Sequence, residues 1–491
     1  MRRLSGLDAG FLSLETPTTP MTIGSLSILD PATDSGRLDV DRLRAFLRSR
    51  LESAPVLCRR LSRVPFDLWR PYWTEVAPAD VDLEYHVEKT ELPKPRGWRE
   101  ISQLVAWELS RPLERERPLW QLLFVEGLDS VPEVAVGAVA IISRVHHAAV
   151  DGVSGAEILG ALSDAGGRPP VRARVAPGGV RVNAREGGVV EVIRRLGRDV
   201  AGAPAEVSRT IGRSLLGFGG GALHLAKQEI GRQVTSTAST RASSISFMAP
   251  RTRLNRPVTA RRSWAPALFR LDLIKAIKAA RDATVNDVVL AICAGALREW
   301  LKARDDLPQE PLVAMVPVSV RSDTQRSTGG NLVSAMLISL ATDEPDPLQR
   351  LSKIRAAARS SKVTHQAVGA RTLVDAAQLV PFALSGLGVR LYSRLHMAER
   401  HRPLFNLVIT NVPGPPVSLS VAGASMLFHV AAAPVFDGLG LILPIFSYAG
   451  TLSVGVTADH DVMPDATEFA DRLTMAFEEL ESSALSGGDG E

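Results

Sequence analysis

The stretch His146-His147-Ala148-Ala149-Val150-Asp151-Gly152 decides how this chain folds and what it can do. It follows an apolar run over residues 134–142, which predicts a buried strand, and precedes residues 153–159, whose apolar side chains recur at helical spacing. Two imidazoles and a carboxylate therefore lie on a loop that leaves a core strand, where a rigid scaffold can orient them. Because histidine gains and loses a proton near neutral pH, the stretch predicts a site of proton transfer.

The complete HHxxxDG pattern favours a functional loop over two simpler alternatives. A histidine followed by an aspartate four residues later arises by chance in many chains, and a lone buried histidine is often a hydrogen-bonded core residue. A metal site is disfavoured, because adjacent histidines on an extended segment point to opposite faces and no third His or Cys at ligand spacing is nearby. Asp151 can reach back to fix the loop, and Gly152 permits a turn that a Cβ would hinder.

Length and composition indicate a packed protein of two domains in a reducing compartment. The chain has 491 residues, of which 45% are hydrophobic. Cys58 and Cys293 are far apart and neither belongs to a CxxC pair, which disfavours a disulfide scaffold and a zinc site. The first residues lack the apolar core of a secretory signal, so we expect a cytoplasmic protein.

Two stretches without charged side chains, residues 403–436 and 438–458, test the possibility of a membrane-spanning helix. Asparagines and prolines interrupt the first, and Pro444 and several glycines interrupt the second. Such breaks are typical of short buried strands joined by turns. We therefore expect no transmembrane helix.

A basic segment separates the two halves. Residues 168–262 contain 18 Lys and Arg against 5 Asp and Glu, a net charge of +13, while the rest of the chain carries −9. Apolar residues recur at helical spacing between Val189 and Phe218, with arginines among them. This pattern fits a membrane-surface helix or a linker helix packed on the protein's own surface. Nucleic acid is not expected, because neither aromatic interleaving nor a recognition-helix motif accompanies the charge.

Each half is expected to mix strands and helices, so the fold class is α/β in the mixed α+β sense. We assign residues 1–165 to an N-terminal subdomain, 166–261 to the partly helical linker and 262–491 to a C-terminal subdomain. Expected strands cover residues 22–29, 134–145, 264–270, 313–321, 332–340, 405–411, 425–432, 440–446 and 451–457. Expected helices cover residues 40–51, 100–109, 273–280, 347–363, 373–395 and 466–480, and one that Thr284 or Asn286 caps and that runs to about residue 302.

Further segments show a resemblance that runs nearly end to end. They are Leu7–Leu12 with Pro17–Met21, Arg117-Pro118-Leu119-Trp120, Val285–Ala291, Val316–Arg321, Gly330-Asn331 and Thr410–Pro415. With the histidine motif, they make the chain similar to the bacterial wax ester synthase/acyl-CoA:diacylglycerol acyltransferases, including the actinobacterial triacylglycerol synthases. Peptide-synthetase condensation domains share HHxxxDG, but not the segments around Trp120, Asn286 and Asn411.

The resemblance implies an architecture and a reaction. The expected fold is two chloramphenicol-acetyltransferase-like subdomains around a central tunnel, with His147 near its middle. The expected reaction transfers a long-chain acyl group from acyl-CoA, as co-substrate and without any other cofactor, to diacylglycerol or a long-chain alcohol. Such acceptors are membrane-soluble, so we expect peripheral attachment to the inner membrane or to lipid droplets.

The resemblance also implies residue roles. His147 is the general base, and Asp151 and Gly152 support and shape its loop. His146 packs against the neighbouring subdomain or lines the tunnel. Asn286 and Asn411 are oxyanion-donor candidates or loop-capping asparagines; Gly414 shapes a turn beside a substrate channel, and Trp120 is a core residue or a substrate contact.

Two other functions remain open at this point. One is an HHxxxDG acyltransferase of the condensation or polyketide-associated type, which would act on carrier-bound substrates. The other is a non-catalytic lipid-body surface protein. The intact His147 and Asp151 argue against the second.

Overall fold

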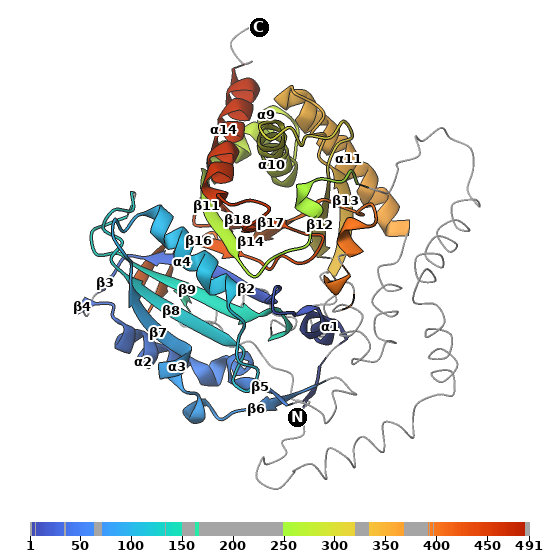
Figure 1. Cartoon of the computed structure of the whole chain (residues 1–491). Coiled ribbons are helices and arrows are strands. Elements are labelled where there is room, and N and C mark those ends of the chain that lie inside the picture. Colours follow the sequence, from blue (N-terminus) through green and yellow to red (C-terminus); the bar gives the residue numbers. More distant parts are fainter. Residues whose placement is uncertain are drawn as a thin grey trace, which may run out of the picture. The chain divides into compact units, whose positions relative to one another are not determined.

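The computed structural model describes residues 2–4, 6–33, 36–62, 71–132, 134–149, 163–165, 249–319, 333–367, 391, 393–395 and 397–486 (Figure 1). The described residues on the two sides of the central segment belong to one compact unit. This unit contains two large β-sheets, each with helices packed against it (Figure 1).

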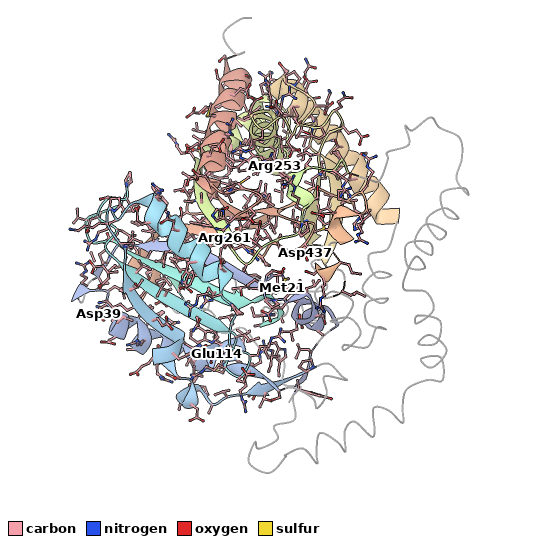
Figure 2. All side chains as sticks on the ribbon, viewed as in Figure 1. Met21, Asp39, Glu114, Arg253, Arg261 and Asp437 are labelled. Atoms are coloured by element: carbon pink, nitrogen blue, oxygen red, sulfur yellow. The ribbon has the colours of Figure 1, made fainter. Side chains whose placement is uncertain are left out.

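The first sheet carries the histidine motif. Its seven strands lie in the order β10-β15-β16-β2-β9-β8-β7, and all neighbours are antiparallel except β7 and β8. The strands are β2 (Thr22–Leu29), β7 (Val87–Glu91), β8 (Trp120–Glu126), β9 (Val139–His146), β10 (Asp164–Ala165), β15 (Leu419–Val421) and β16 (Ala424–Ala432). Met21 immediately precedes β2 (Figure 2).

Two strands of this sheet come from the C-terminal part of the chain. β16 pairs with β2 from Met426↔Leu29 to Ala432↔Gly24, and β15 joins β16 to β10. The sequence-based division at residues 165 and 262 is therefore not a division between the sheets. The alternating pattern of residues 425–432 predicts a strand but carries no information about its partner, because long-range pairing depends on the assembled core.

The second sheet has six strands in the order β11-β18-β17-β14-β12-β13. They are β11 (Arg262–Arg270), β12 (Val313–Ser319), β13 (Val333–Ser339), β14 (Leu407–Pro413), β17 (Leu441–Tyr448) and β18 (Thr451–Asp459). The helices α9 (Leu271–Ala280), α10 (Val285–Lys302), α11 (Pro347–Ala367) and α14 (Ala466–Leu485) pack together with this sheet (Figure 1). Their apolar side chains and those of the strands form one continuous core.

Smaller elements complete the described chain. The helices are α1 (Gly6–Leu14), α2 (Val40–Arg50), α3 (Leu83–His86) and α4 (Trp98–Ser110). The short strands are β1 (Arg2–Arg3), β3 (Ala32–Thr33), β4 (Gly36–Arg37), β5 (Arg59–Ser62) and β6 (Tyr72–Glu75). Single 3₁₀ turns include η1 (Leu51–Ser53), η2 (Pro55–Cys58), η4 (Pro78–Asp80), η5 (His147–Ala149), η6 (Arg253–Asn255) and η7 (Met397–Glu399). Helix α4 packs against both β2 of the first sheet and β11 of the second.

Most predicted strands and helices are present, with ends that shift by a few residues. The strand expected over residues 134–145 begins only at Val139, and residues 249–261, expected to belong to the linker, are anchored to the C-terminal half. There Arg253 pairs with Asp306, and the Asn255 amide donates to the Gly438 carbonyl oxygen. The helix predicted over residues 189–218 lies outside the described residues, as do residues 373–390 of the helix predicted over residues 373–395. None of the helices in the described ranges is both long enough and apolar enough to span a membrane.

Candidate active site

Both histidines lie at the C-terminal end of strand β9, and residues just before the two neighbouring strands, β8 and β2, bond to the main chain of the histidines. The His146 N–H donates to the Leu119 carbonyl oxygen at 3.0 Å, just before β8. The His147 N–H donates to the Met21 carbonyl oxygen at 2.7 Å, just before β2. Two of the segments that carry the family resemblance thus hold the motif from opposite sides, at the point where β9 turns into η5.

The His147 ring is stacked on Phe11 of α1. The two ring centroids are 3.6 Å apart and the planes are inclined by 24°. Nδ1 has no hydrogen-bond partner in the described part of the chain. Burial lowers the pKa of His147 to about 4, against a smaller opposing effect of its own main chain. The imidazole is therefore neutral at physiological pH and able to accept a proton.

His146 is fully buried and has a structural arrangement. Its Nδ1 accepts the Ala148 N–H at 3.0 Å. Its Nε2 lies 3.5 Å from Oε1 of Glu15, at the outer limit of a hydrogen bond. His146 thus links the turn after β9 to Glu15.

Glu15 is a site residue that the sequence reasoning missed. Its other carboxylate oxygen accepts from Arg115, whose Nε lies at 2.9 Å. Burial alone would raise the pKa of Glu15, but His146 and Arg115 together lower it to about 2. The signal in the sequence was an acidic residue directly after α1, within the segment that runs on to Met21.

The structure places Trp120 in the core of the first sheet. Its indole N–H donates to the Leu57 carbonyl oxygen at 2.8 Å, and its ring stacks on His86 with centroids 4.3 Å apart. Only 2% of Trp120 is accessible. The indole N–H is therefore already hydrogen-bonded and one face of the ring is already stacked. Both contacts favour a core role for Trp120 over a contact with substrate.

Asn286 lies in the first turn of α10 and does not cap it. Thr284 caps this helix: its hydroxyl accepts the Asp287 N–H at 3.1 Å, and the Asp287 carboxylate accepts the Thr284 N–H at 2.9 Å. Arg281, five residues before Asn286, donates to carbonyl oxygens in the last turn of α14. At the other end of α10, Arg304 pairs with Glu468 in the first turn of α14.

This arrangement separates Asn286 from the histidines. The 18 residues of α10 span about 27 Å at 1.5 Å per residue. Just before α14 begins, the Met463 carbonyl oxygen accepts from Ser263, the residue that follows Arg262. Arg262 in turn donates to Thr18, close to Met21. The contacts that lead from the histidines therefore reach the start of α14, which lies beside the C-terminal end of α10. Asn286 lies at the N-terminal end of α10, beside the last turn of α14.

Asn411 and Gly414 lie where β14 ends against β17. Asn411 is half-buried, and the next residue, Val412, packs on the core of the first sheet. A Cβ on Gly414 would lie 2.3 Å from the Ser447 carbonyl oxygen and 2.4 Å from the Phe446 ring, so only glycine permits this close approach. Asp151 and Gly152 lie outside the described residues.

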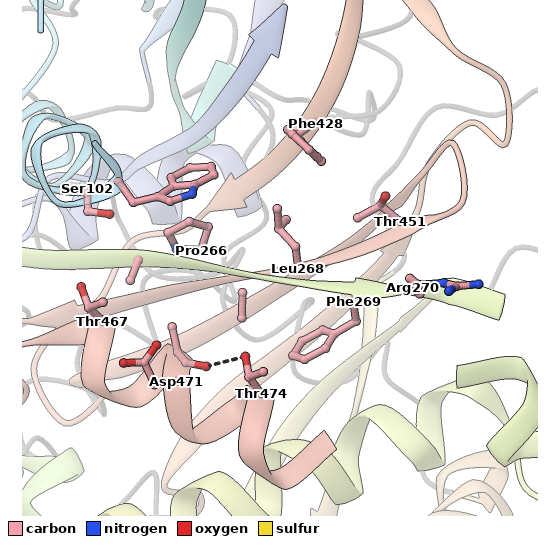
Figure 3. Close-up of a pocket in the computed structure, with 14 residues that line it drawn as sticks. Ser102, Pro266, Leu268, Phe269, Arg270, Phe428, Thr451, Thr467, Asp471 and Thr474 are labelled. Carbon is pink, nitrogen blue, oxygen red and sulfur yellow. Dashed lines mark hydrogen bonds between the residues drawn. The ribbon is translucent and has the colours of Figure 1, made fainter. Parts of the chain in front are cut away.

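A cavity of about 550 Å³ lies elsewhere (Figure 3). It is lined by Trp98 and Ser102 of α4, by β11 from Ala265 to Arg270, and by residues of α14 that include Asp471. None of the candidate site residues lines it.

Family models match most of the chain. The model described as wax ester synthase/diacylglycerol acyltransferase catalytic domain matches residues 4–289, and the model of the WS/DGAT C-terminal domain matches residues 329–481. The first match includes the histidine motif and the start of the second sheet.

Relatives extend the similarity over nearly full lengths. A Mycobacterium tuberculosis protein named "Putative diacyglycerol O-acyltransferase" is 36% identical, covering 97% of this chain and 99% of its own. A second protein of that organism and name is 32% identical, covering 98% and 90%.

Solved structures agree with the fold. The wax ester synthase/diacylglycerol acyltransferase from Marinobacter aquaeolei VT8 matches with a TM-score of 0.68 and 28% identity, covering 99% of this chain and 100% of that one. The first condensation domain of the CDA synthetase matches with a TM-score of 0.54 at 15% identity, covering 99% and 97%, which shows a shared fold alone.

Proposed function

The chain belongs to the wax ester synthase/diacylglycerol acyltransferase family, and on that premise we propose that it transfers a long-chain acyl group from acyl-CoA to the hydroxyl of diacylglycerol, and also to that of a long-chain alcohol. The names of the mycobacterial relatives support diacylglycerol as acceptor. The name of the Marinobacter structure combines wax ester synthase with diacylglycerol acyltransferase, which supports both acceptors.

The observation that carries the chemical part is the neutral, half-buried ring of His147. Its pKa of about 4 keeps it unprotonated, and its main chain is fixed by the bond to Met21. In the proposed step the imidazole removes the acceptor's hydroxyl proton as the oxygen attacks the thioester carbonyl carbon. The tetrahedral intermediate then expels the CoA thiolate, which takes the proton from His147. General-base assistance of this kind contributes about 10²–10⁴-fold to a rate.

The remaining roles follow from the placement of each residue. Of the two oxyanion-donor candidates, we retain Asn411, because it lies beside a residue packed on the first sheet whereas Asn286 lies at the far end of α10. Asp151 and Gly152 are proposed to support the loop that follows η5. The tunnel around His147 is proposed on the family resemblance.

The test is product analysis with purified full-length protein. Palmitoyl-CoA is supplied with 1,2-dioleoylglycerol or with hexadecanol, and both CoA release and the ester formed are measured. We expect triacylglycerol with the first acceptor and wax ester with the second. CoA release without either ester, or acyl transfer only from a carrier protein, would contradict the proposal.

We also propose peripheral association with an anionic membrane or lipid-droplet surface. Three large apolar side chains are exposed within a short segment: Leu391 at 52%, Leu395 at 43% and Leu404 at 57%. Arg394 and Arg400 are exposed in the same segment. Exposed leucines among arginines suit a lipid surface, where the apolar side chains insert and the cations face anionic headgroups.

Co-sedimentation with liposomes tests this association. The triple change of Leu391, Leu395 and Leu404 to Gln is expected to release the protein from vesicles that contain anionic lipid. Met475→Gln is the control, because Met475 is 64% exposed but lies on α14 among acidic residues. Release by arginine-to-glutamine changes at Arg194, Arg195 and Arg198 alone would instead assign the association to the central basic segment.

A further inference from the structure

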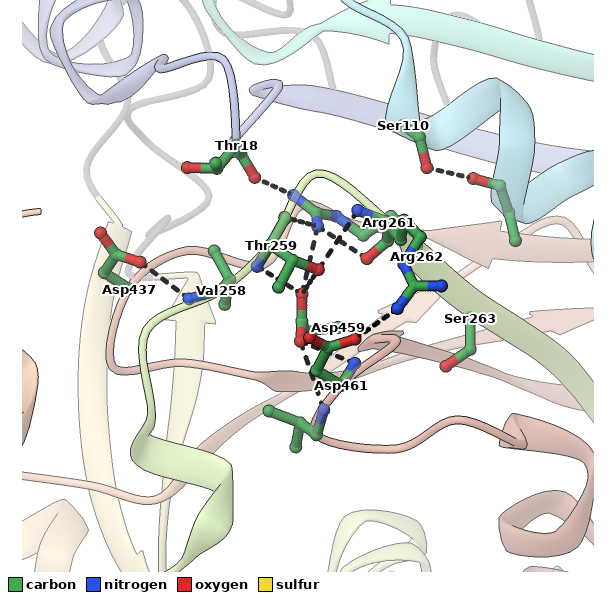
Figure 4. Close-up of polar contacts among 12 residues, drawn as sticks. Thr18, Ser110, Val258, Thr259, Arg261, Arg262, Ser263, Asp437, Asp459 and Asp461 are labelled. Atoms are coloured by element: carbon green, nitrogen blue, oxygen red, sulfur yellow. Dashed lines mark hydrogen bonds and ion pairs between the residues drawn. The ribbon is translucent and has the colours of Figure 1, made fainter.

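A buried arginine connects the second sheet to the segment that holds the histidines (Figure 4). Arg262 begins β11, and its side chain is only 2% accessible. One guanidinium nitrogen donates to the Thr18 carbonyl oxygen at 2.5 Å. The other donates to the Thr259 carbonyl oxygen at 2.6 Å and lies 3.6 Å from the Asp459 carboxylate.

Asp459 is a rigid anchor for this arginine. Its side chain is fully buried on β18, and one oxygen accepts both the N–H and the hydroxyl of Thr259, at 2.7 and 2.8 Å. The other oxygen accepts the N–H groups of Asp461 and Val462, at 3.0 and 3.2 Å. These four hydrogen bonds fix the position of the carboxylate beside Arg262. Burial lowers the pKa of Arg262 to about 10, so the guanidinium remains charged at neutral pH.

The segment to which Arg262 donates, residues 15–21, contains a tight turn. Thr16 and Thr19 exchange two main-chain hydrogen bonds, at 3.2 and 3.0 Å, and Thr18 lies at the tip. Thr19 is buried. The two hydrogen bonds join the chain on both sides of Thr18, so we expect a displacement at Thr18 to be passed to both flanks.

Both flanks of this turn touch the histidine motif. On one side, Glu15 faces His146 Nε2 at 3.5 Å. On the other side, the Met21 carbonyl oxygen accepts the His147 N–H at 2.7 Å. The Glu15–Met21 turn is thus bonded to the second sheet at its tip, and at its base it is bonded to His147 and lies beside His146.

We infer that Arg262 is a positioning residue for His147: through Thr18 and the Glu15–Met21 turn, it fixes the position of the base relative to the second sheet. The inference rests on the proposed role of His147 as general base. Arginine suits this task because its planar fork reaches Thr18, Thr259 and Asp459 at once, which a lysine cannot.

The chain provides a matched control at the next position. Arg261 also pairs with an aspartate, Asp461, at 2.8 Å, but both side chains are more than half exposed. Arg261→Lys and Arg262→Lys therefore make the same chemical change in neighbouring residues. Only the second removes a link to the Glu15–Met21 turn.

The experiment measures kcat, the KM for acyl-CoA and hydrogen exchange of the His147 amide in the full-length enzyme. For Arg262→Lys we expect kcat to fall by roughly 10- to 10²-fold, the range for a misplaced catalytic group. We expect the KM for acyl-CoA to stay within about two-fold, and the His147 amide to exchange faster because its bond to Met21 is less well held. Arg261→Lys is expected to match the wild type in all three.

A second variant covers the case in which Arg262→Lys does not fold. Pro17 is exposed in the Glu15–Met21 turn, so Pro17→Gly loosens the turn without touching the buried ion pair. It is expected to give the same lower kcat and faster exchange. A kcat near that of the wild type, an effect confined to KM, or unchanged protection of the His147 amide would overturn the inference. The exchange measurement needs no turnover, so it stands apart from the test of His147 as base.

Discussion

The Phe11 ring of helix α1 is stacked on the His147 ring at a centroid separation of 3.6 Å, so it covers one face of the candidate base. This contact excludes water from one face of the imidazole and contributes to the burial that lowers its pKa to about 4. A helix near the N-terminus thus sets the environment of a residue more than a hundred positions later.

Phe11→Ala should raise the pKa of His147 and lower kcat. Water would reach the exposed face of the ring, and the ring would lose the stacking contact that limits its orientation. NMR of the imidazole protons over pH 4–8 measures the first effect and steady-state kinetics the second. Phe11→Leu, which keeps the face covered, is the control. An unshifted titration in the alanine variant would contradict the role assigned to Phe11.

His147→Ala should abolish ester formation while thermal stability stays close to that of the wild type. His146→Ala should keep measurable activity but unfold at a lower temperature, because it leaves the buried Ala148 N–H without its partner at a cost of about 1–3 kcal/mol. Activity assays and thermal melts separate the two effects. Near wild-type turnover in His147→Ala would reject the general-base role.

The free energy of unfolding should fall as pH is lowered from 6.5 towards 4. Burial lowers the pKa of both His147 and His429 from 6.5 to about 4, so the unfolded chain binds more protons in this window. The contribution of each neutral histidine to the free energy of unfolding is complete above pH 6.5 and is lost as pH falls through 4. The loss is at most about 3 kcal/mol per histidine.

Urea denaturation between pH 4.5 and 7 measures this loss. His429 is buried and its Nδ1 lies 2.9 Å from the Ser27 hydroxyl, a contact that a glutamine amide can replace. His429→Gln should therefore flatten the pH dependence, whereas His401→Gln, at an exposed position, should not. Equal slopes in wild type and His429→Gln would show that the buried ring does not contribute.

Trp120→Phe should lower stability by about 1 kcal/mol and leave both KM values unchanged. The change removes the hydrogen bond to the Leu57 carbonyl oxygen and keeps the ring beside His86. Trp107→Phe on α4, where Trp107 is 61% exposed, is the matched control. A selective rise in KM for either substrate would instead restore Trp120 as a substrate contact.

Gly414→Ala should destabilise the protein by about 1–3 kcal/mol, because the new Cβ meets the Ser447 carbonyl oxygen and the Phe446 ring. Gly10→Ala is the control, since a Cβ at Gly10 would have no atom within 4 Å and alanine favours the helix there. Denaturant midpoints compare the two. Equal stability of both variants would contradict the prediction, because it would mean that Phe446 and Ser447 of β17 shift away from the new Cβ at no cost in stability.

The sequence by itself determined many of the elements and a candidate centre for the chemistry. Periodicity predicted β2, β11, β18 and α14, because side-chain spacing is a local property of helices and strands. The HHxxxDG motif singled out His146 and His147, and residue types narrowed the N-cap of α10 to Thr284 or Asn286, of which the structure shows Thr284.

Only the tertiary structure decided which elements pair and which side chains meet. It placed β16 in the first sheet, Phe11 and Glu15 beside the histidines, and Asn286 at the far end of α10. The link from Arg262 to Thr18 joins positions that are 244 apart in the chain. Contacts of this kind depend on the summed packing of both sheets, which no local pattern encodes, so spacing and composition could not predict them.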